Sequence, residues 1–332
     1  MTDRKALVIG ATGGIGGALA DRLAAGGWRV RALNRDPDGA LRRSGQAAFE
    51  WVAGDALRAD DVIAAAHGCE VIVHAANPPG YRNWAGLALP MLKNAIAAAN
   101  AGGARLLFPG NVYNYGEDAF PRISEGAPQT PATRKGRIRV AMEAMLRQAD
   151  VPVLIVRCGD FFGPRPGSNW LSQGIVRPGR PLSSVLYPGP PEVRHAWAWL
   201  PDVAEVFARL LHRDLGRFET FHMQGHEITG HDLVAGLEAA AGRPVTVRRL
   251  PWLGVAMAAP FNETLREMLE MRYLWDRPVL LDNARLVATL GAEPRTPLVD
   301  ALRAALEGQQ SLPLMGRERP RSGQGEGGRA GV

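Results

Sequence analysis

A short apolar run followed by three regularly spaced glycines lies near the N-terminus, and it constrains the fold more than any other feature. The run spans Ala6 to Ile9 and has the length of a strand. Gly10, Gly13 and Gly16 follow, and Ala18 to Ala25 has the pattern of a helix. Strand, glycine turn and helix in this order are typical of a dinucleotide-binding unit. The glycines allow a tight turn, a close approach to the pyrophosphate and close helix–strand packing. The pyrophosphate then rests on the N–H groups at the helix N-terminus.

The end of the second predicted strand, Trp28 to Leu33, indicates which dinucleotide is bound. A sheet that prefers NAD carries Asp or Glu there to hold the ribose 2′-hydroxyl. This chain has Asn34 and Arg35 instead. Asn does not repel a 2′-phosphate, and an arginine can pair with it in bidentate fashion. The sequence therefore favours NADP(H) over NAD(H). NAD(H) stays as the alternative because Asp36 follows directly and is able to accept from a ribose hydroxyl.

Strands and helices alternate from residue 5 to about 160. This alternation predicts an α/β fold, a Rossmann-type doubly wound parallel sheet with a small C-terminal substrate lobe. We expect a dinucleotide-binding domain over residues 1–165 with later segments interleaved, a substrate-binding lobe over 166–307 and a disordered tail over 308–332. Asp202 is predicted to cap a helix together with Glu205, and Thr229 to cap another that runs to Ala241.

The landmarks along the chain together resemble the short-chain dehydrogenase/reductase superfamily, in the extended form that includes sugar-nucleotide epimerases and dehydratases. They are the glycine triplet, Gly54-Asp55 after a third strand, the strand-like runs 71–77 and 106–111, and the segment 153–164. The resemblance implies a nicotinamide dinucleotide enzyme. The predicted cofactor-binding residues are Gly10, Thr12, Gly13, Gly14, Ile15, Gly16, Asn34, Arg35, Asp55, Ala56, Ala75, Ala76, Asn77, Arg139 and Gly159.

The catalytic positions of that family are the place where this sequence departs from it. The family uses Ser or Thr together with Tyr-x-x-x-Lys on a helix, and no Tyr-x-x-x-Lys occurs here. Aligning Asn114-Tyr115-Gly116 with the usual Val-Tyr-Gly places Asn111 at the Ser or Thr position. The helix match places Lys135 at the Tyr position and Arg139 at the Lys position.

Lys135, Asn111 and Arg139 can replace the family's catalytic residues if they take the following roles. Lys135 and Arg139 are one helical turn apart, and the like charge of Arg139 favours a neutral lysine with a lowered pKa. Lys135 then serves as the general acid, Asn111 polarises the carbonyl and Arg139 holds the ribose. Tyr113 and Tyr115 are rival acids. The simpler alternative is that Lys135 and Arg139 belong to a solvated basic helix face.

The predicted pocket is rich in aromatic side chains, which suits an apolar or aromatic substrate, and packing in the core is the alternative explanation for much of this aromatic content. The predicted substrate-contacting residues are Trp84, Asp160, Phe161, Phe162, Trp170, His195 and Trp197. The segment Leu253 to Met271 is largely apolar and predicts one long helix, with Met257 and Phe261 either covering the pocket or packed in the core.

The composition limits the remaining possibilities. The net charge is +6, without a basic run interleaved with aromatics, so we predict a small-molecule substrate and no nucleic acid. Cys69 and Cys158 are the two cysteines, which suggests no disulfide framework and no metal site. No apolar run approaches a membrane span and no signal-peptide pattern is seen, which favours the cytoplasm. A homodimer is left open.

Three functions are compatible with these residues. We expect an NADP-dependent oxidoreductase that interconverts a carbonyl and an alcohol on a hydrophobic substrate. The alternatives are a sugar-nucleotide epimerase or dehydratase with tightly held cofactor, and a non-catalytic NADP-binding sensor.

Overall fold

The computed structural model describes residues 4–78, 83–165, 169–176 and 181–310. Residues 311–332, most of the expected tail, lie outside the described residues. The last helix, α11 (Leu298–Gln310), runs three residues into the region where that tail was expected to begin. No helix in the described ranges is long and apolar enough to cross a membrane.

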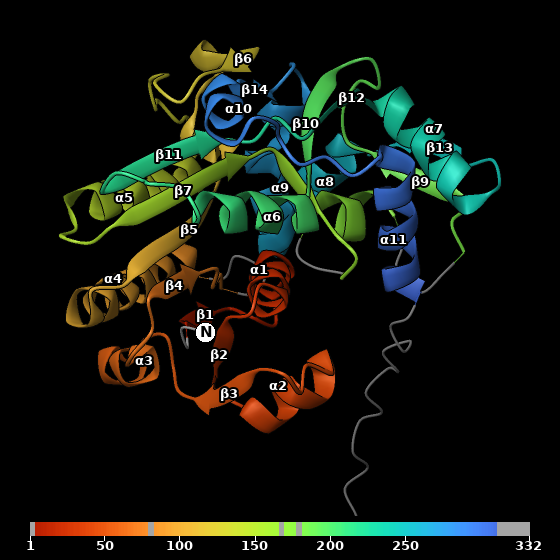
Figure 1. The fold of residues 1–332 in the computed structure, drawn as a ribbon. Helices are drawn as coiled ribbons and strands as arrows, with labels where there is room; N and C mark the ends of the chain where they lie inside the picture. The colour runs from red at the N-terminus through yellow and green to blue at the C-terminus, as the bar shows by residue number, and fades with distance from the viewer. Residues whose placement is uncertain (1–3, 79–82, 166–168, 177–180, 311–332) are drawn as a thin grey trace, which may run out of the picture.

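A seven-stranded parallel sheet forms the centre of the molecule, in the order β11-β7-β5-β4-β1-β2-β3 (Figure 1). The strand order runs in opposite directions from β1, so the predicted doubly wound α/β fold is confirmed. The seven strands are β1 (Lys5–Ile9), β2 (Arg29–Asn34), β3 (Glu50–Ala53), β4 (Val71–His74), β5 (Arg105–Asn111), β7 (Val153–Cys158) and β11 (Phe218–His222).

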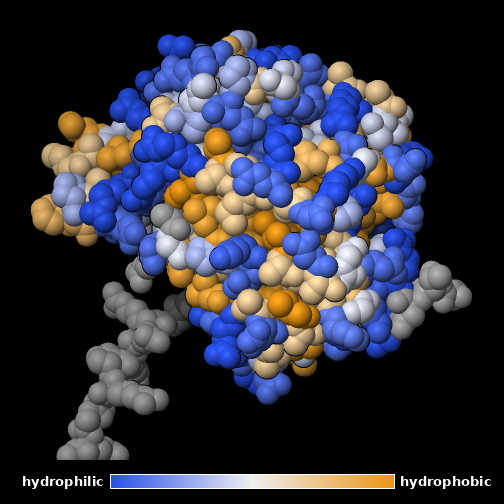
Figure 2. All heavy atoms as spheres, turned by 90° about the vertical axis from the view of Figure 1, so that its left-hand side faces the viewer, coloured by the Kyte–Doolittle hydropathy of each residue, from blue (hydrophilic) through white to orange (hydrophobic). Residues whose placement is uncertain are grey.

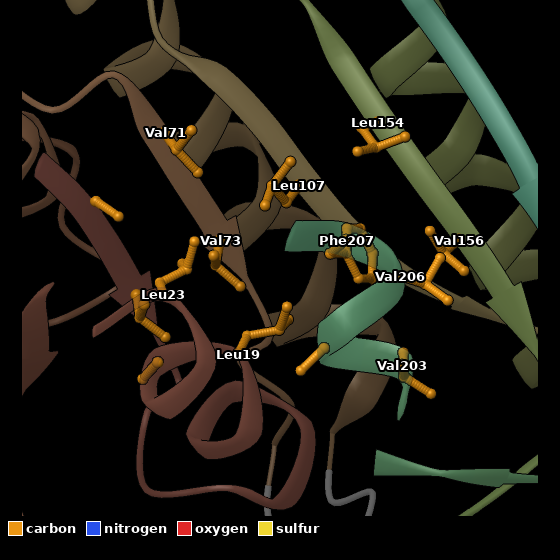
Figure 3. Packing of buried hydrophobic residues seen from close by; sticks show 14 of the residues in the cluster. Leu19, Leu23, Val71, Val73, Leu107, Leu154, Val156, Val203, Val206 and Phe207 are labelled. Carbon is orange, nitrogen blue, oxygen red and sulfur yellow. The ribbon is translucent and has the colours of Figure 1, made fainter. Parts of the chain in front are cut away.

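Helices cover both faces of this sheet. On one face α1 (Gly14–Ala25) and α6 (Leu200–Leu210) pack their apolar sides against β4, β5 and β7. Figure 3 shows Leu19 and Leu23 of α1 beside Val203 and Phe207 of α6 in this layer. On the other face lie α3 (Ala59–Ala66), α4 (Trp84–Gly102) and α5 (Arg134–Gln148). The short α2 (Pro37–Ser44) follows β2.

The remaining elements form a lobe above the carboxyl ends of the strands. Its sheets are β8 (Asp160–Phe162) with β10 (Arg194–Trp199) and β12 (His226–Thr229), β9 (Ser184–Tyr187) with β13 (Thr246–Arg249), and β6 (Arg122–Ile123) with β14 (Leu280–Leu281). Its α-helices are α7 (Gly230–Ala241), α8 (Trp252–Ala258), α9 (Glu263–Glu270) and α11, whereas α10 (Ala284–Leu290) packs on β11 and adds Leu286 to the core of the main sheet. Single turns occur at Val112–Asn114, Glu117–Ala119, Leu171–Ile175, Ala259–Phe261 and Arg272–Trp275. Because β11 and α6 belong to the main layers, the lobe and the sheet are interleaved along the chain.

Two sequence expectations about helices are wrong. Trp199, and not Asp202, occupies the N-cap position of α6, and its side chain makes no capping hydrogen bond, because the helix begins at Leu200 with Pro201 in its first turn. The Asp202 carboxylate instead accepts hydrogen bonds of 2.7 Å from the N–H and the hydroxyl of Thr296. The segment 253–271 is not one helix, since Pro260 ends the regular part and the Asn262 side chain caps α9. The predicted cap at Thr229 is confirmed, as part of a capping box with Asp232.

Candidate functional site

The turn after β1 can be built only from glycine at two of its positions. Gly10 has φ +97°, and a Cβ there would lie 2.7 Å from the carbonyl carbon of Ala75. A Cβ at Gly16 would lie 2.2 Å from the Gly10 oxygen. Both distances are shorter than real contacts, so any side chain would push α1 away from β1 and β4. This close packing brings the N-terminus of α1 to the carboxyl edge of the sheet.

That N-terminus is suited to an anion. Gly13 is its N-cap, no described side chain caps it, and its first turn contains no acidic residue. The first N–H groups of a helix have no partner within the helix and carry the positive end of its dipole. Thr12 and Gly13 are exposed, and Gly14 and Ile15 are half-buried, so the surface at this turn is accessible. A pyrophosphate therefore fits here, and the glycine cradle supports the predicted dinucleotide site.

The polar side chains that follow β2 form local hydrogen bonds. Asn34 accepts the N–H of Asp36 at 2.9 Å, and Asp36 caps α2 by accepting the N–H of Gly39 at 3.0 Å. This second hydrogen bond holds the pKa of Asp36 below its usual range. Arg35 is exposed and makes no ion pair or hydrogen bond with any residue that the structure describes. Asp36 thus forms local hydrogen bonds, and the Arg35 side chain is accessible to a ligand.

The predicted adenine and nicotinamide sides of the cofactor site lie along the same edge of the sheet. The N–H of Asp55 donates to Asp61 at 2.9 Å, and the carbonyl oxygen of Ala56 accepts from Asn94 at 2.9 Å. Ala75 and Ala76 are half-buried directly after β4, and the side chain of Asn77 accepts a hydrogen bond from the indole of Trp84. A Cβ at Gly159, after β7, would lie 2.0 Å from the Ala196 oxygen.

Lys135 is buried in an ion pair, so the alternative of a solvated helix face is wrong for this residue. Its side chain is 3% exposed, and Nζ lies 3.1 Å from the Glu267 carboxylate and 2.9 Å from the Glu267 carbonyl oxygen. Burial lowers the pKa of Lys135, although Glu267 opposes this shift. The positive neighbour that contributes to the lowered pKa is Arg134, and not Arg139 as expected.

The partner carboxylates come from α9, and neither was among the predicted site residues. Glu270 accepts the N–H groups of Arg134 and Lys135, the latter at 3.2 Å, and Glu267 also pairs with the Arg134 guanidinium. Thr133 completes the cap by accepting the N–H of Gly136 at 3.0 Å. The two carboxylates lie three residues apart on one helix and complement the basic start of α5. The sequence gives no indication that these two segments meet.

Arg139 lies at the carboxyl ends of β4 and β5. Its guanidinium carbon is 5.3 Å from the ring centroid of Trp84 and 5.5 Å from that of Phe108. It also contributes, after burial, to lowering the pKa of His74 to about 3. The Arg139 side chain thus lies near His74 at the carboxyl end of β4, and its contact with a ribose stays a prediction.

Asn111, Tyr113 and Tyr115 have different surroundings. Asn111 ends β5, and its side-chain oxygen accepts the N–H of Tyr113 at 3.1 Å, which leaves its amide N–H groups as donors. Tyr113 is half-buried. Tyr115 is fully buried, and its hydroxyl lies 3.0 Å from His222 and within hydrogen-bond distance of Arg157. Burial raises the pKa of Tyr115 to about 12. Arg157 is itself paired with Glu143 in the interior, so this tyrosine belongs to a structural network.

Three of the predicted substrate residues, Trp170, His195 and Trp197, pack around Trp275 in a cluster whose rings are largely buried. Trp84 lies apart from them, beside Asn77 and Arg139. The ring centroid of Trp275 lies 4.7 Å from His195, 5.1 Å from Trp170, 5.7 Å from Tyr187 and 6.1 Å from Trp197. Burial lowers the pKa of His195 to about 4, so its imidazole is neutral. Phe161 is half-buried, and Phe162 packs 6.3 Å from Trp197. Trp275 and Tyr187 were not among the predicted residues.

Asp160 places a carboxylate beside this aromatic cluster. It is the register partner of Trp197 between β8 and β10, and it finds no hydrogen-bond or ion-pair partner among the described residues. Burial raises the pKa of Asp160 to about 7, and Asp160 contributes, after burial, to raising the pKa of Tyr187. A half-buried acid without a described partner thus lies where the substrate is predicted.

Known proteins share this architecture at low sequence identity. A UDP-glucose-4-epimerase from Stenotrophomonas maltophila, solved with NAD and formylated UDP-arabinopyranose, is 19% identical with a TM-score of 0.72, over 92% of this chain and 98% of that one. A UDP-glucose 4-epimerase from Bifidobacterium longum, solved with NAD+ and UDP, is 16% identical with a TM-score of 0.69 and the same coverage. A UDP-glucuronic acid 4-epimerase from Bacillus cereus, solved with its sugar nucleotide and NAD, is 16% identical with a TM-score of 0.70 and that coverage too.

These structural similarities establish the fold, and a match to a family model shows which family the chain belongs to. No curated protein sequence matches this chain. The model of the NAD dependent epimerase/dehydratase family matches residues 6–221, from β1 through β11. The chain therefore belongs to the NAD dependent epimerase/dehydratase family.

Proposed function

We propose that the protein binds a nicotinamide dinucleotide and uses it for hydride transfer at a carbon that alternates between alcohol and ketone in a small-molecule substrate. The observation that carries the proposal is the turn at Gly10 to Gly16, which holds an uncapped helix N-terminus at the carboxyl edge of the sheet. Asn111, Lys135 and Arg139 belong to β5 and α5, which adjoin that edge. When bound, the dinucleotide supplies the hydride acceptor or donor.

Asn111 and Lys135 are the residues that we assign to the reacting oxygen. The Asn111 amide donates a hydrogen bond to it and stabilises the developing negative charge. The Lys135 ammonium exchanges a proton with the same oxygen, and burial favours this exchange by lowering its pKa. Arg139 holds the ribose hydroxyls. Tyr115 is left out because burial raises the pKa of its hydroxyl to about 12, whereas burial lowers the pKa of Lys135.

Two forms of this chemistry are supported by different observations. Family membership, and neighbours solved with UDP-sugars and NAD, favour an epimerase or dehydratase in which the hydride returns to the substrate. Asn34 and the unengaged Arg35 favour NADP(H), and an NADP(H) preference favours a net reductase. We place the epimerase or dehydratase form first.

The test begins with binding and continues with turnover. Titrations of the purified chain with NAD+, NADH, NADP+ and NADPH should give binding of at least one pair. Incubation with UDP-glucose, UDP-arabinose or UDP-glucuronic acid, followed by NMR, should show an epimer or dehydrated product without net cofactor consumption. Consumption of NADPH only with ketones or aldehydes would select the reductase form. Binding without either reaction would reject hydride transfer and leave a sensor.

The assigned proton donor is tested in a background that keeps the ion pair balanced. We expect the double variant Lys135→Met/Glu267→Gln to bind the dinucleotide nearly as well as Glu267→Gln alone, but to turn over slower by two to four orders of magnitude, the usual range for a general acid. Lys93→Met, at an exposed lysine of α4, is the matched control. Equal turnover in the double variant and in Glu267→Gln would remove Lys135 from the mechanism.

A further inference from the structure

The segment that joins β13 to α9 displays an apolar surface to solvent. Residues 250–262, which include α8, contain no charged side chain. Leu253 is 76% exposed, Met257 65% and Phe261 92%. Leu253 and Met257 are one helical turn apart on α8, and Phe261 lies in the turn Ala259–Phe261 that follows; these three residues are called the apolar stripe. In Figure 2, apolar atoms gather on a projection at the left edge, the side that corresponds to the back of Figure 1, where α8 and α9 lie.

This exposure belongs to an anchored element. The opposite side of the segment packs inward through Val255, 7% exposed, and Ala259, 4% exposed. The indole of Trp252 donates to the Pro188 oxygen at 2.6 Å. α9, which packs against α8, is bound to the start of α5 through Glu267 and Glu270. The stripe is therefore presented by a fixed scaffold.

Exposed arginines adjoin the stripe along the chain. Arg248 and Arg249 end β13 directly before the uncharged segment, and among the described residues neither makes an ion pair. Arg266 on α9 donates a hydrogen bond to the Pro260 oxygen at 3.3 Å. An uncharged apolar ridge with an unneutralised basic border is the arrangement by which a protein binds an anionic bilayer surface, the apolar side chains entering the interface and the arginines meeting lipid phosphates.

We propose that this face, formed by Leu253, Met257 and Phe261 with Arg248 and Arg249, docks onto an anionic lipid bilayer without spanning it. α8 has seven residues, which is far short of a membrane span. A second copy of the chain fits the face less well, because a two-fold contact would bring the same arginines toward one another. Since α9 connects the stripe to Lys135, docking would hold the candidate site near the bilayer.

Vesicle flotation of the full chain tests the proposal. Wild type should float with phosphatidylcholine–phosphatidylglycerol vesicles and remain unbound with pure phosphatidylcholine. The triple variant Leu253→Ser/Met257→Ser/Phe261→Ser and the double variant Arg248→Gln/Arg249→Gln should each reduce the partition coefficient at least ~10-fold. The matched control is Leu41→Ser/Leu57→Ser/Ile63→Ser, which removes three exposed apolar side chains elsewhere and should float like wild type.

The outcome of vesicle flotation supports or overturns the docking proposal. Failure of wild type to bind anionic vesicles, or flotation of the triple variant equal to wild type, would overturn the proposal. Light scattering provides a further check, since a wild-type dimer that the triple variant converts to a monomer would reassign the face to self-association. A blue shift of tryptophan fluorescence on vesicle binding, absent in the triple variant, would place the neighbourhood of Trp252 at the lipid and support docking.

Discussion

Helices α1 and α5 cover opposite faces of the central sheet, and their N-termini are capped in opposite ways. At α1 the cap is Gly13, with no acidic residue in the first turn. At α5 the cap is Thr133, and Glu270 accepts the first N–H groups while Glu267 pairs with the two basic side chains that follow. One helix end is open to an external anion, and the other is already occupied by carboxylates of the lobe.

This difference separates binding from stability. A helix N-terminus without internal partners contributes to the affinity for a ligand, because its N–H groups are satisfied only when an anion is bound. An N-terminus that is capped and ion-paired contributes to folding, because its loss leaves buried polar groups unpaired. Changes at α1 should therefore alter dinucleotide affinity, and changes at α5 should alter the free energy of unfolding.

The largest effect is expected at the closed end. Lys135→Met should lower the free energy of unfolding by about 3 kcal/mol, the lower end of the range for breaking a buried pair, because Glu267 loses its buried partner and keeps only the exposed Arg134. Denaturant unfolding measures the change. Lys135→Met/Glu267→Leu should regain most of the loss, and Lys93→Met on α4 should stay within about 0.5 kcal/mol of wild type. Additive effects of Lys135→Met and Glu267→Leu would show that the pair is not coupled.

At the open end the effect should appear in affinity alone. Thr12→Asp places a carboxylate beside the turn at Gly13, where it repels a pyrophosphate, and should weaken dinucleotide binding at least ~30-fold, about 2 kcal/mol. Calorimetric titration measures the affinity. Thr12→Asn, which has nearly the same shape as the aspartate without its charge, should change it little. Because Thr12 is exposed, unfolding should be unaffected in both variants. Equal affinities for Thr12→Asp and Thr12→Asn would break the contrast between the two ends.

The open end could be predicted from the sequence, and the closed end could not, because the information for the first is local. The turn at Gly10 to Gly16 depends on contacts within one strand–helix unit and its neighbour, which glycine spacing reports directly. The closed end depends on Glu267, more than a hundred residues from Lys135, and no periodicity indicates that pairing. For the same reason the basic start of α5 could be interpreted as a solvated face, although Lys135 is buried.

Two other differences have the same origin. The Tyr115 hydroxyl is engaged by Arg157 and His222, which come from other strands, so its sequence position after Asn111 gave no indication of that network. Asp202 binds Thr296, far along the chain, in place of capping α6. The break at Pro260 and Asn262 had local signals, a proline and a capping residue, but the apolar run around them matched the pattern of one helix.

Cofactor choice should give a smaller effect at the open end. Arg35→Ala should weaken NADPH binding about 10-fold, since one charge-assisted contact to the 2′-phosphate is worth about 1.5 kcal/mol or more, and should leave NADH binding nearly unchanged. Parallel titrations with both dinucleotides measure the ratio. Arg42→Ala, at an exposed arginine of α2, is the control. Equal losses for NADPH and NADH would retract the preference for NADP(H).

The smallest effect is expected for the pH dependence of stability at Asp160. Unlike the Glu267 carboxylate, the Asp160 carboxylate has no hydrogen-bond or ion-pair partner among the described residues. Burial raises the pKa of Asp160 to about 7 from its ordinary value near 4, so the native state binds its proton more tightly than the unfolded chain does. The stability associated with that proton is present below about pH 4 and is lost as the pH rises toward 7. Asp160→Asn should therefore match wild type in melting temperature near pH 4 and exceed it at pH 8. Asp214→Asn, at an exposed acid, should show no such divergence. Because Asp160 is half-buried, solvent reduces the gain, and melting temperatures of Asp160→Asn and wild type that stay parallel across this range would contradict the raised pKa.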